Sequence, residues 1–120
     1  MELVVETADS YGEKSSERVQ CTKEVSEKGI KYSYKNELGE SKIFIMEDRV
    51  QVMRKGSITS NQIFRVDEDT RFIYRTPYLV KNFILKTDYL KRDEKGVELL
   101  YSIYEEQEKI NEIKLVIREV

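Results

Sequence analysis

Four residues that can hydrogen-bond or carry charge lie where the spacing of the sequence calls for apolar side chains: Arg54, Tyr74, Thr76 and Thr87. Each continues an alternating apolar run, so in a strand all four would point toward the interior. An unpaired buried guanidinium is very costly, and the hydroxyls of tyrosine and threonine are suitable partners for it. These four residues form the first candidate site.

This candidate site has two interpretations. In the first, it is the polar end of a barrel lumen and binds the carboxylate or phosphate of a small amphipathic or anionic ligand, because arginine pairs with such groups through two parallel hydrogen bonds. In the second, Arg54 closes the end of the barrel, is held by protein acceptors and has a structural role only. Arg54, Thr76 and Thr87 end their runs, where a barrel opens to water, and this favours the second interpretation.

The chain lacks the residues that most enzyme mechanisms need. The chain has no histidine, which excludes Ser-His-Asp and Cys-His sites and zinc sites built on imidazole. It has no phosphate-binding loop and no dinucleotide motif. The acidic run Asp67 to Asp69 is typical of a polar turn rather than of a metal site, and Cys21 is typical of a buried strand cysteine. We therefore expect a non-enzymatic protein without a cofactor or a metal.

Alternating apolar residues recur almost from end to end and predict short strands. These runs fall at residues 3–7, 30–34, 50–54, 72–76, 83–87, 97–103 and 113–117. Turn residues such as Lys28-Gly29 and Lys55-Gly56 separate them. The intervals are too short for the crossover helices that parallel strands require. The sequence thus predicts an all-β fold: a single antiparallel, mostly up-and-down barrel of 8–10 strands, forming one domain over residues 1–120.

The last part of the chain has a second interpretation. Apolar residues between Leu99 and Ile117 also fit an amphipathic helix, but their tighter alternation and β-branched residues favour a hairpin that turns near Glu106 to Lys109. Seven aromatic residues share the inward side of the predicted strands and suggest a filled interior. They are Tyr32, Tyr34, Phe64, Phe72, Tyr74, Phe83 and Tyr101.

Charge is unevenly distributed along the chain. The 21 basic and 23 acidic side chains give a net charge of −2, yet residues 49–92 hold ten basic and four acidic residues. If neighbouring strands pair, this block forms a basic wall. The residues proposed for it are Arg71, Arg75, Lys81 and Lys86. The alternative function is therefore an interaction module that binds RNA or a protein through this wall, although a solvated strand face has the same composition.

A single cysteine cannot form an internal disulfide, and the N-terminal residues lack the pattern of a signal peptide. The longest apolar stretch, Ile43 to Met46, is four residues long, far below the roughly 18 that a membrane-spanning helix needs. We expect a cytoplasmic protein that does not span a membrane.

Several short motifs occur in a familiar order. They are Val52 to Gly56, Phe64, Tyr74 to Tyr78, Thr87, Leu100-Tyr101 and Ile113 to Ile117. With these motifs, residues 2–119 resemble the YwiB-like family, small bacterial proteins of unknown function with a calycin-type, lipocalin-like barrel. The family pattern has a glycine where this chain has Leu79. The resemblance implies a barrel but no activity, ligand or catalytic residue.

Overall fold

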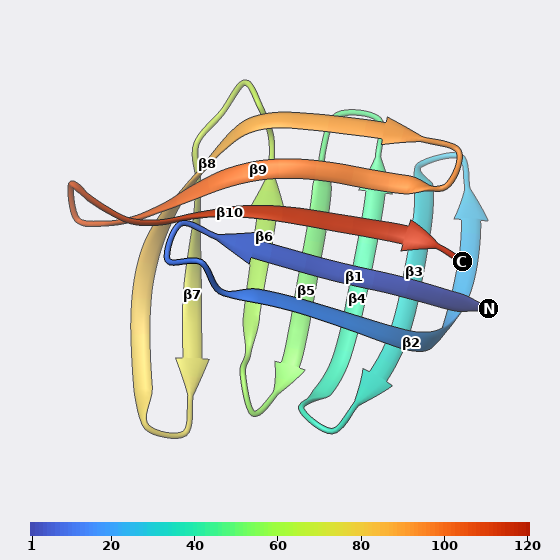
Figure 1. Ribbon diagram of the computed structural model, residues 1–120, viewed down its shortest axis with the longest axis horizontal. Coiled ribbons are helices and arrows are strands. Elements are labelled where there is room, and N and C mark those ends of the chain that lie inside the picture. The colour runs from blue at the N-terminus through green and yellow to red at the C-terminus, as the bar shows by residue number, and fades with distance from the viewer.

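The protein is built from strands alone, joined by tight turns (Figure 1). The computed structural model describes all residues, 1–120. The strands are β1 (Glu2–Asp9), β2 (Lys14–Ser26), β3 (Gly29–Asn36), β4 (Gly39–Met46), β5 (Val50–Gly56), β6 (Ser60–Phe64), β7 (Thr70–Thr76), β8 (Leu79–Asp93), β9 (Gly96–Glu105) and β10 (Glu108–Glu119). A membrane-spanning helix is not found. The prediction of 8–10 antiparallel strands is confirmed.

The strands form one sheet in the order β6-β5-β4-β3-β2-β1-β10-β9-β8-β7. Every neighbouring pair is antiparallel, and all but one of these pairs are consecutive along the chain. The exception is β1 with β10, which places the two ends of the chain side by side in the middle of the sheet (Figure 1). The up-and-down topology follows from the short turns between strands.

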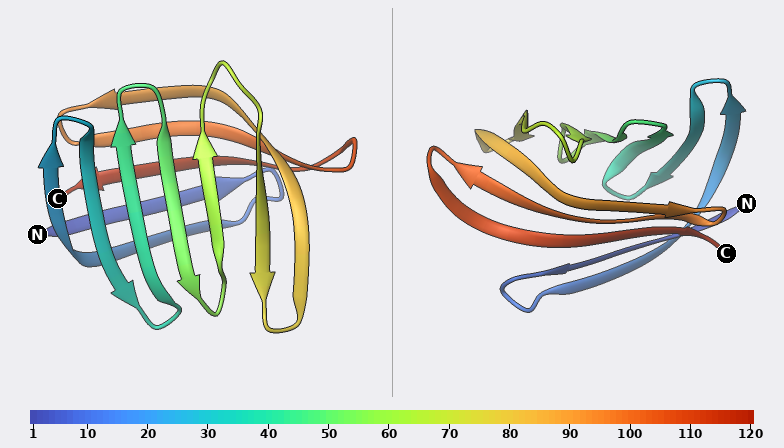
Figure 2. Two further views of the ribbon diagram at one scale, coloured as in Figure 1. Left: turned by 180° about the vertical axis from the view of Figure 1, so that it is seen from behind. Right: turned by 90° about the horizontal axis from the view of Figure 1, so that it is seen from above.

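Two long strands bend the sheet into a barrel of two crossing layers (Figure 2). The first half of β2 pairs with β1 and its second half pairs with β3. In the same way β8 pairs with β7 over Leu79–Leu85 and with β9 over Ile84–Asp93, with a bulge between Thr87 and Tyr89. Bends and bulges of this kind let a strand pass from one layer to the other.

The residues between Leu99 and Ile117 form the β9–β10 hairpin, so the helical interpretation is wrong and the hairpin is confirmed. The turn lies at Glu106 and Gln107, and Glu106 has a positive φ of 58°. Within each arm of this hairpin, apolar residues recur at every second position. An extended strand therefore places all of these apolar side chains on the one face that packs against the core.

The interior is filled over much of its length by 19 buried apolar residues. The seven aromatic residues predicted to face inward are all part of this packing. Tyr32, Tyr34, Phe64, Phe72 and Tyr101 are buried, whereas Tyr74 and Phe83 are partly buried and pack against the core. Phe64 and Tyr101 meet edge to face, with ring centroids 4.8 Å apart, and so join the two layers across the barrel.

The barrel is not closed by a continuous ladder between β6 and β7, the two ends of the strand order. At one end of this seam, Thr59 and Arg75 exchange two backbone hydrogen bonds. At the other end, the Thr70 hydroxyl donates to the Ile63 carbonyl over 2.6 Å. Between these points no backbone hydrogen bond joins the two strands. We call this gap the β6–β7 seam.

Candidate anion-binding site at the barrel mouth

Arg54 lies near the end of β5, on the inward face that Val50 and Val52 also occupy. The register places it directly beside Ser41 on β4 and Ser60 on β6, and Ser41 lies beside Tyr34 on β3. Four neighbouring strands therefore present one inward row of an arginine and three hydroxyl-bearing residues. The row stands at the end of the barrel where the β3–β4 and β5–β6 turns lie (Figure 1).

The guanidinium of Arg54 has no protein partner: no carboxylate lies within ion-pair distance, and no side-chain hydrogen bond of the structure involves it. It lines a cavity of about 870 Å³ between the first half of β2 and the ends of β3 to β5. We call this cavity the mouth. Glu17 also lines the mouth and accepts a hydrogen bond from Asn36 over 2.8 Å.

At the opposite end of the barrel a different arginine is held by protein acceptors. Arg92 of β8 donates hydrogen bonds to the backbone carbonyls of Met46 and Glu47, at the end of β4. These are the protein acceptors that a structural role for Arg54 would require. Arg92 has such acceptors and Arg54 has none.

The phenols of two buried tyrosines, Tyr34 and Tyr101, lie close enough to Arg54 to feel its charge. Burial raises the pKa of Tyr101 to about 12, while the nearby charge of Arg54 and a hydrogen bond with Gln62 act in the opposite direction. Burial also raises the pKa of Tyr34, again against the charge of Arg54 and a hydrogen bond with Ser41. Both phenols are thus protonated at neutral pH, and both can donate a hydrogen bond.

Thr87 lies deeper in the barrel, beside Tyr101 in the β8–β9 register. It is only 7% exposed, and its hydroxyl oxygen has no hydrogen-bond partner in the structure. A buried hydroxyl without a partner costs free energy that a bound polar group or water would recover. Polar character therefore extends from the mouth into the interior.

Of the four residues of the sequence-predicted site, only Arg54 lines the mouth, and Tyr74 and Thr76 lie elsewhere. Tyr74 is on the inward face of β7, where its ring lies near that of Phe83, with centroids 6.4 Å apart. The hydroxyl of Thr76 accepts a hydrogen bond from the backbone N–H of Tyr78 and so stabilises the β7–β8 turn. Of the four residues, the structure associates only Arg54 and Thr87 with the polar interior.

Sequence reasoning missed four inward polar residues. Ser41 continues the inward side of Ile43 and Ile45, and Ser60 and Gln62 continue that of Phe64. Glu17 lies on the inward side of β2, opposite Val5. The rule that identified Arg54, a polar residue that continues an alternating apolar run, would also have found Ser41 and Glu17. It would have missed Ser60 and Gln62, because Phe64 is the only apolar residue on their side of β6.

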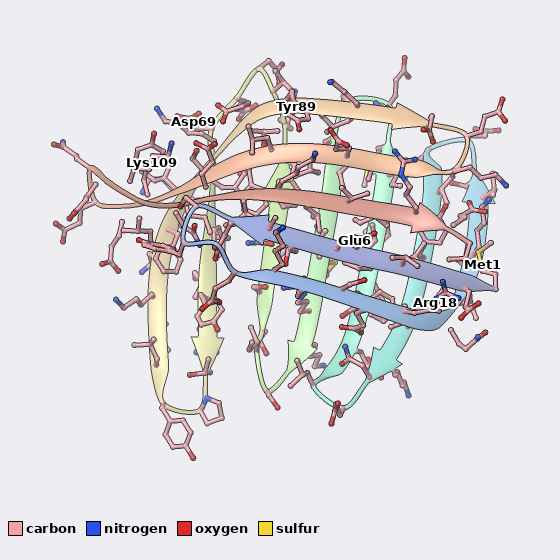
Figure 3. The ribbon with its side chains drawn as sticks, in the orientation of Figure 1. Met1, Glu6, Arg18, Asp69, Tyr89 and Lys109 are labelled. Carbon is pink, nitrogen blue, oxygen red and sulfur yellow. The ribbon has the colours of Figure 1, made fainter.

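The four residues proposed for the basic wall do not share one surface. Arg71 and Arg75 lie on the outward face of β7 without ion pairs. Lys81 is opposite Tyr74 and so lies on the inward side of β8, where it pairs with Glu105 at 3.1 Å. Lys86 pairs with Asp69, in the β6–β7 turn shown in Figure 3, and its ammonium group lies 5.1 Å from the centroid of the Tyr104 ring.

Cys21 and the acidic run Asp67 to Asp69, the possible reactive and metal-binding groups of the sequence, interact with other parts of the protein. Cys21 is buried beside Tyr34, and burial raises the pKa of its thiol, which lowers its reactivity at neutral pH. The prediction of a buried strand cysteine is confirmed. In the exposed β6–β7 turn, Arg65 pairs with both Asp67 and Glu68.

The class of protein defined by this fold is a ten-stranded, nearly closed antiparallel barrel with one polar mouth and one arginine-capped end. The chain belongs to the family described as a domain of unknown function, DUF1934, whose match covers residues 4–117. It is similar to the crystal structure of ywiB protein from Bacillus subtilis, with a TM-score of 0.74 and 18% identity. That match covers 99% of this chain and 90% of the other.

At this identity the structural likeness establishes the fold alone. The resemblance to a YwiB-like family is confirmed by the family match and by the structural match together. No curated protein matches the chain.

Proposed function

We propose that the protein is a non-enzymatic, calycin-like binding module whose mouth takes a small amphipathic molecule with one anionic group. The single observation that carries this proposal is the guanidinium of Arg54, which faces the mouth without a protein partner. Arginine recognises carboxylate and phosphate through a planar pair of donors, so the unfilled donors of Arg54 define the chemistry of the ligand.

The lining of the mouth suits the two ends of such a molecule. Its anionic group would meet Arg54 and the hydroxyls of Tyr34 and Ser41. Its apolar part would lie against the apolar side chains that line the same cavity, which are Val5, Val19, Leu38 and Ile58. Ligand sites commonly combine an apolar lining with a few polar groups that fix orientation.

Glu17 restricts the charge of the ligand. Its carboxylate lines the same cavity as Arg54 and carries only one hydrogen bond, from Asn36. A second negative charge on the ligand would meet repulsion from this carboxylate, because like charges disfavour each other. A monoanion, or a molecule with an amine near its anionic group, fits the mouth better than a dianion.

Calorimetric titration of the purified protein with dodecanoate, dodecyl phosphate and inorganic phosphate tests this proposal. We expect the monoanion dodecanoate to bind, and Arg54→Gln to weaken it at least tenfold through loss of a charge-assisted pair. Lys55→Gln, a neighbouring change on the outward face of β5, serves as the matched control and should leave binding unchanged. Tighter binding of dodecyl phosphate than of dodecanoate would reassign the ligand to phosphate esters.

Two results would contradict the proposal. One is equal binding of dodecanoate by the wild type and Arg54→Gln. The other is the absence of heat with all three probes at millimolar concentration, together with no small molecule retained in native mass spectrometry.

The alternative function, an interaction surface for RNA or a protein over residues 49–92, concerns different residues. Two of its four basic side chains, Lys81 and Lys86, have carboxylate partners. Arg71 and Arg75 remain unpaired, so the alternative depends on the outward face of β7.

A further inference from the structure

The outward face beside the β6–β7 seam is hollowed into a groove of about 1030 Å³. The register aligns Lys42, Met53 and Asn61 across β4, β5 and β6. On the other side of the seam, Ile73 lies beside Asn82 across β7 and β8. Two rows of side chains thus line the groove, one on each side of the seam. Lys42 stands at the outer end of one row, and apolar and amide side chains lie nearer the seam.

The groove holds more positive charge than its carboxylates balance. Five basic side chains line it, and none of them forms an ion pair: Lys42, Arg54, Lys55, Arg71 and Arg75. Only two carboxylates line it, and one of these, Glu40, already pairs with Lys35 at 3.4 Å. In a chain with a net charge of −2, such a concentration of unpaired cations indicates a polyanionic partner.

Backbone groups in the seam add hydrogen-bonding capacity. Arg75 directs its N–H and carbonyl to Thr59 across the seam. In an antiparallel strand alternate residues direct these groups to the same side, so Arg71 and Ile73 also direct theirs into the seam. No ladder partner is present there. Backbone N–H groups of this kind are common ligands of phosphate oxygens.

The apolar and amide side chains at the centre of the groove indicate which kind of polyanion fits it. Met53 is 37% exposed and Ile73 is 47% exposed, and Asn61 and Asn82 lie beside them. The Oδ1 of Asn61 accepts a hydrogen bond from Gln51 over 2.8 Å, so Asn61 offers its amide N–H groups. Apolar side chains can pack on base faces, and asparagine amides can bond base edges. A duplex keeps its base faces stacked, whereas a single strand offers its phosphates to the surrounding cations and its bases to the centre. A purely acidic peptide has no flat apolar group to pack on Met53 and Ile73.

We propose that this outer groove binds single-stranded nucleic acid, with Arg71 and Arg75 on the phosphates and Ile73, Asn61 and Asn82 against the bases. The site lies outside the barrel, so this proposal does not require that the mouth bind a ligand.

Fluorescence anisotropy with a labelled 12-nucleotide oligouridylate tests the proposal. We expect binding at 50 mM salt that weakens linearly on a log–log plot as salt is raised. Arg71→Glu/Arg75→Glu should reduce the affinity at least tenfold. Lys14→Glu/Lys28→Glu has the same change in net charge, at exposed lysines outside the groove and free of ion pairs, and should reduce it far less.

An uncharged variant separates base contacts from general charge attraction. Ile73→Ser should weaken oligouridylate severalfold without changing the salt slope, because it removes no cation. Circular dichroism and thermal unfolding check that each variant remains folded.

Several outcomes would overturn the proposal. They are no binding at 50 mM salt, equal loss in the two double variants, tighter binding of a 12-base-pair duplex, and equal competition by polyglutamate at matched charge. The last of these would assign the groove to an acidic protein partner instead.

Discussion

Of two inward-facing threonines in the barrel, one has a hydrogen-bond partner for its hydroxyl and the other has none. The Thr70 hydroxyl donates to the Ile63 carbonyl, whereas the Thr87 hydroxyl has no partner. Because valine has nearly the same shape, Thr87→Val should raise the free energy of unfolding by about 1 kcal/mol by removing an unsatisfied polar group. Thr70→Val should lower it by about the same amount. Urea denaturation of both variants checks this prediction, and a destabilised Thr87→Val would reveal a bound water or ligand at that hydroxyl.

Glu119 is held by two donors from the opposite layer. Lys23 donates to its carboxylate over 2.7 Å and the phenol of Tyr32 over 2.5 Å. These two hydrogen bonds lower the pKa of Glu119 below its ordinary value of 4.5, in that order of importance. A carboxyl whose pKa is lower in the folded state contributes stability that is fully present above pH 4.5 and is lost as the pH falls through its folded pKa.

Glu119→Gln should therefore reduce the free energy of unfolding by about 1.5–3 kcal/mol at pH 7, the usual range for hydrogen bonds to a charged group. The difference from the wild type should shrink as the pH falls below 4.5. Thermal unfolding of both proteins between pH 3 and 7 measures this difference in stability. A difference that stays constant over this range would show that the charge of Glu119 contributes nothing.

At the level of single residues, period-two alternation was sufficient to place Arg54 and Thr87 inside the barrel. It could not show that Arg54 lacks a partner, because alternation gives the face of a side chain but not the groups beside it, which depend on strand register. The inward face of Lys81 was also missed, since the long strand β8 keeps its alternation beyond the end of the apolar run.

The β9–β10 turn contains a residue in an unfavourable conformation. Glu106 has a φ of 58°, which a side chain with a β-carbon adopts at a cost and which glycine adopts freely. Glu106→Gly should raise the free energy of unfolding by about 0.5–1 kcal/mol. Gln107→Gly, in the same turn but without a positive φ, is the control and should lower it. Equal effects of the two changes would contradict this explanation.

The β6–β7 seam should be the first part of the barrel to exchange its amide hydrogens. The amides of Asn61 and Ile73 face the seam without a ladder partner, whereas those of Val5 and Ile117 lie in the continuous β1–β10 pair. Amide exchange followed by NMR at neutral pH should show Asn61 and Ile73 exchanging at least a hundredfold faster than Val5. Equal protection of the two sets would mean that the seam is closed in solution.

At the level of elements, the sequence was sufficient to identify the strands and the β9–β10 hairpin, because alternation and turn residues are local signals. The seam and the bends were not predicted. The exchange of partners along β2 and β8 depends on which strands meet across the barrel, and no local pattern encodes it.

For the whole molecule, the strand order makes a specific prediction about folding. In a circular permutant that joins residue 120 to residue 1 and opens the chain between Glu68 and Asp69, every ladder would pair consecutive strands. Only the few contacts across the β6–β7 seam would then join the two ends of the chain. Because proteins with more local contacts fold faster, this permutant should refold several-fold faster than the natural chain. Stopped-flow fluorescence of the tyrosines measures the rate.

A second permutant, opened between Glu37 and Leu38, is the matched control. It makes the β1–β10 pair local but turns the β3–β4 pair into an end-to-end contact. It should refold no faster than the natural chain. If both permutants behaved alike, the position of the long-range pair would not determine the folding rate.

Arg54 lines the mouth inside the barrel and also borders the groove outside it. One guanidinium cannot neutralise two anions at full strength, so a carboxylate held in the mouth would remove a cation from the groove. By thermodynamic reciprocity, nucleic acid in the groove would weaken the interior ligand by the same factor. A single side chain between two cavities would thus make each occupant an antagonist of the other.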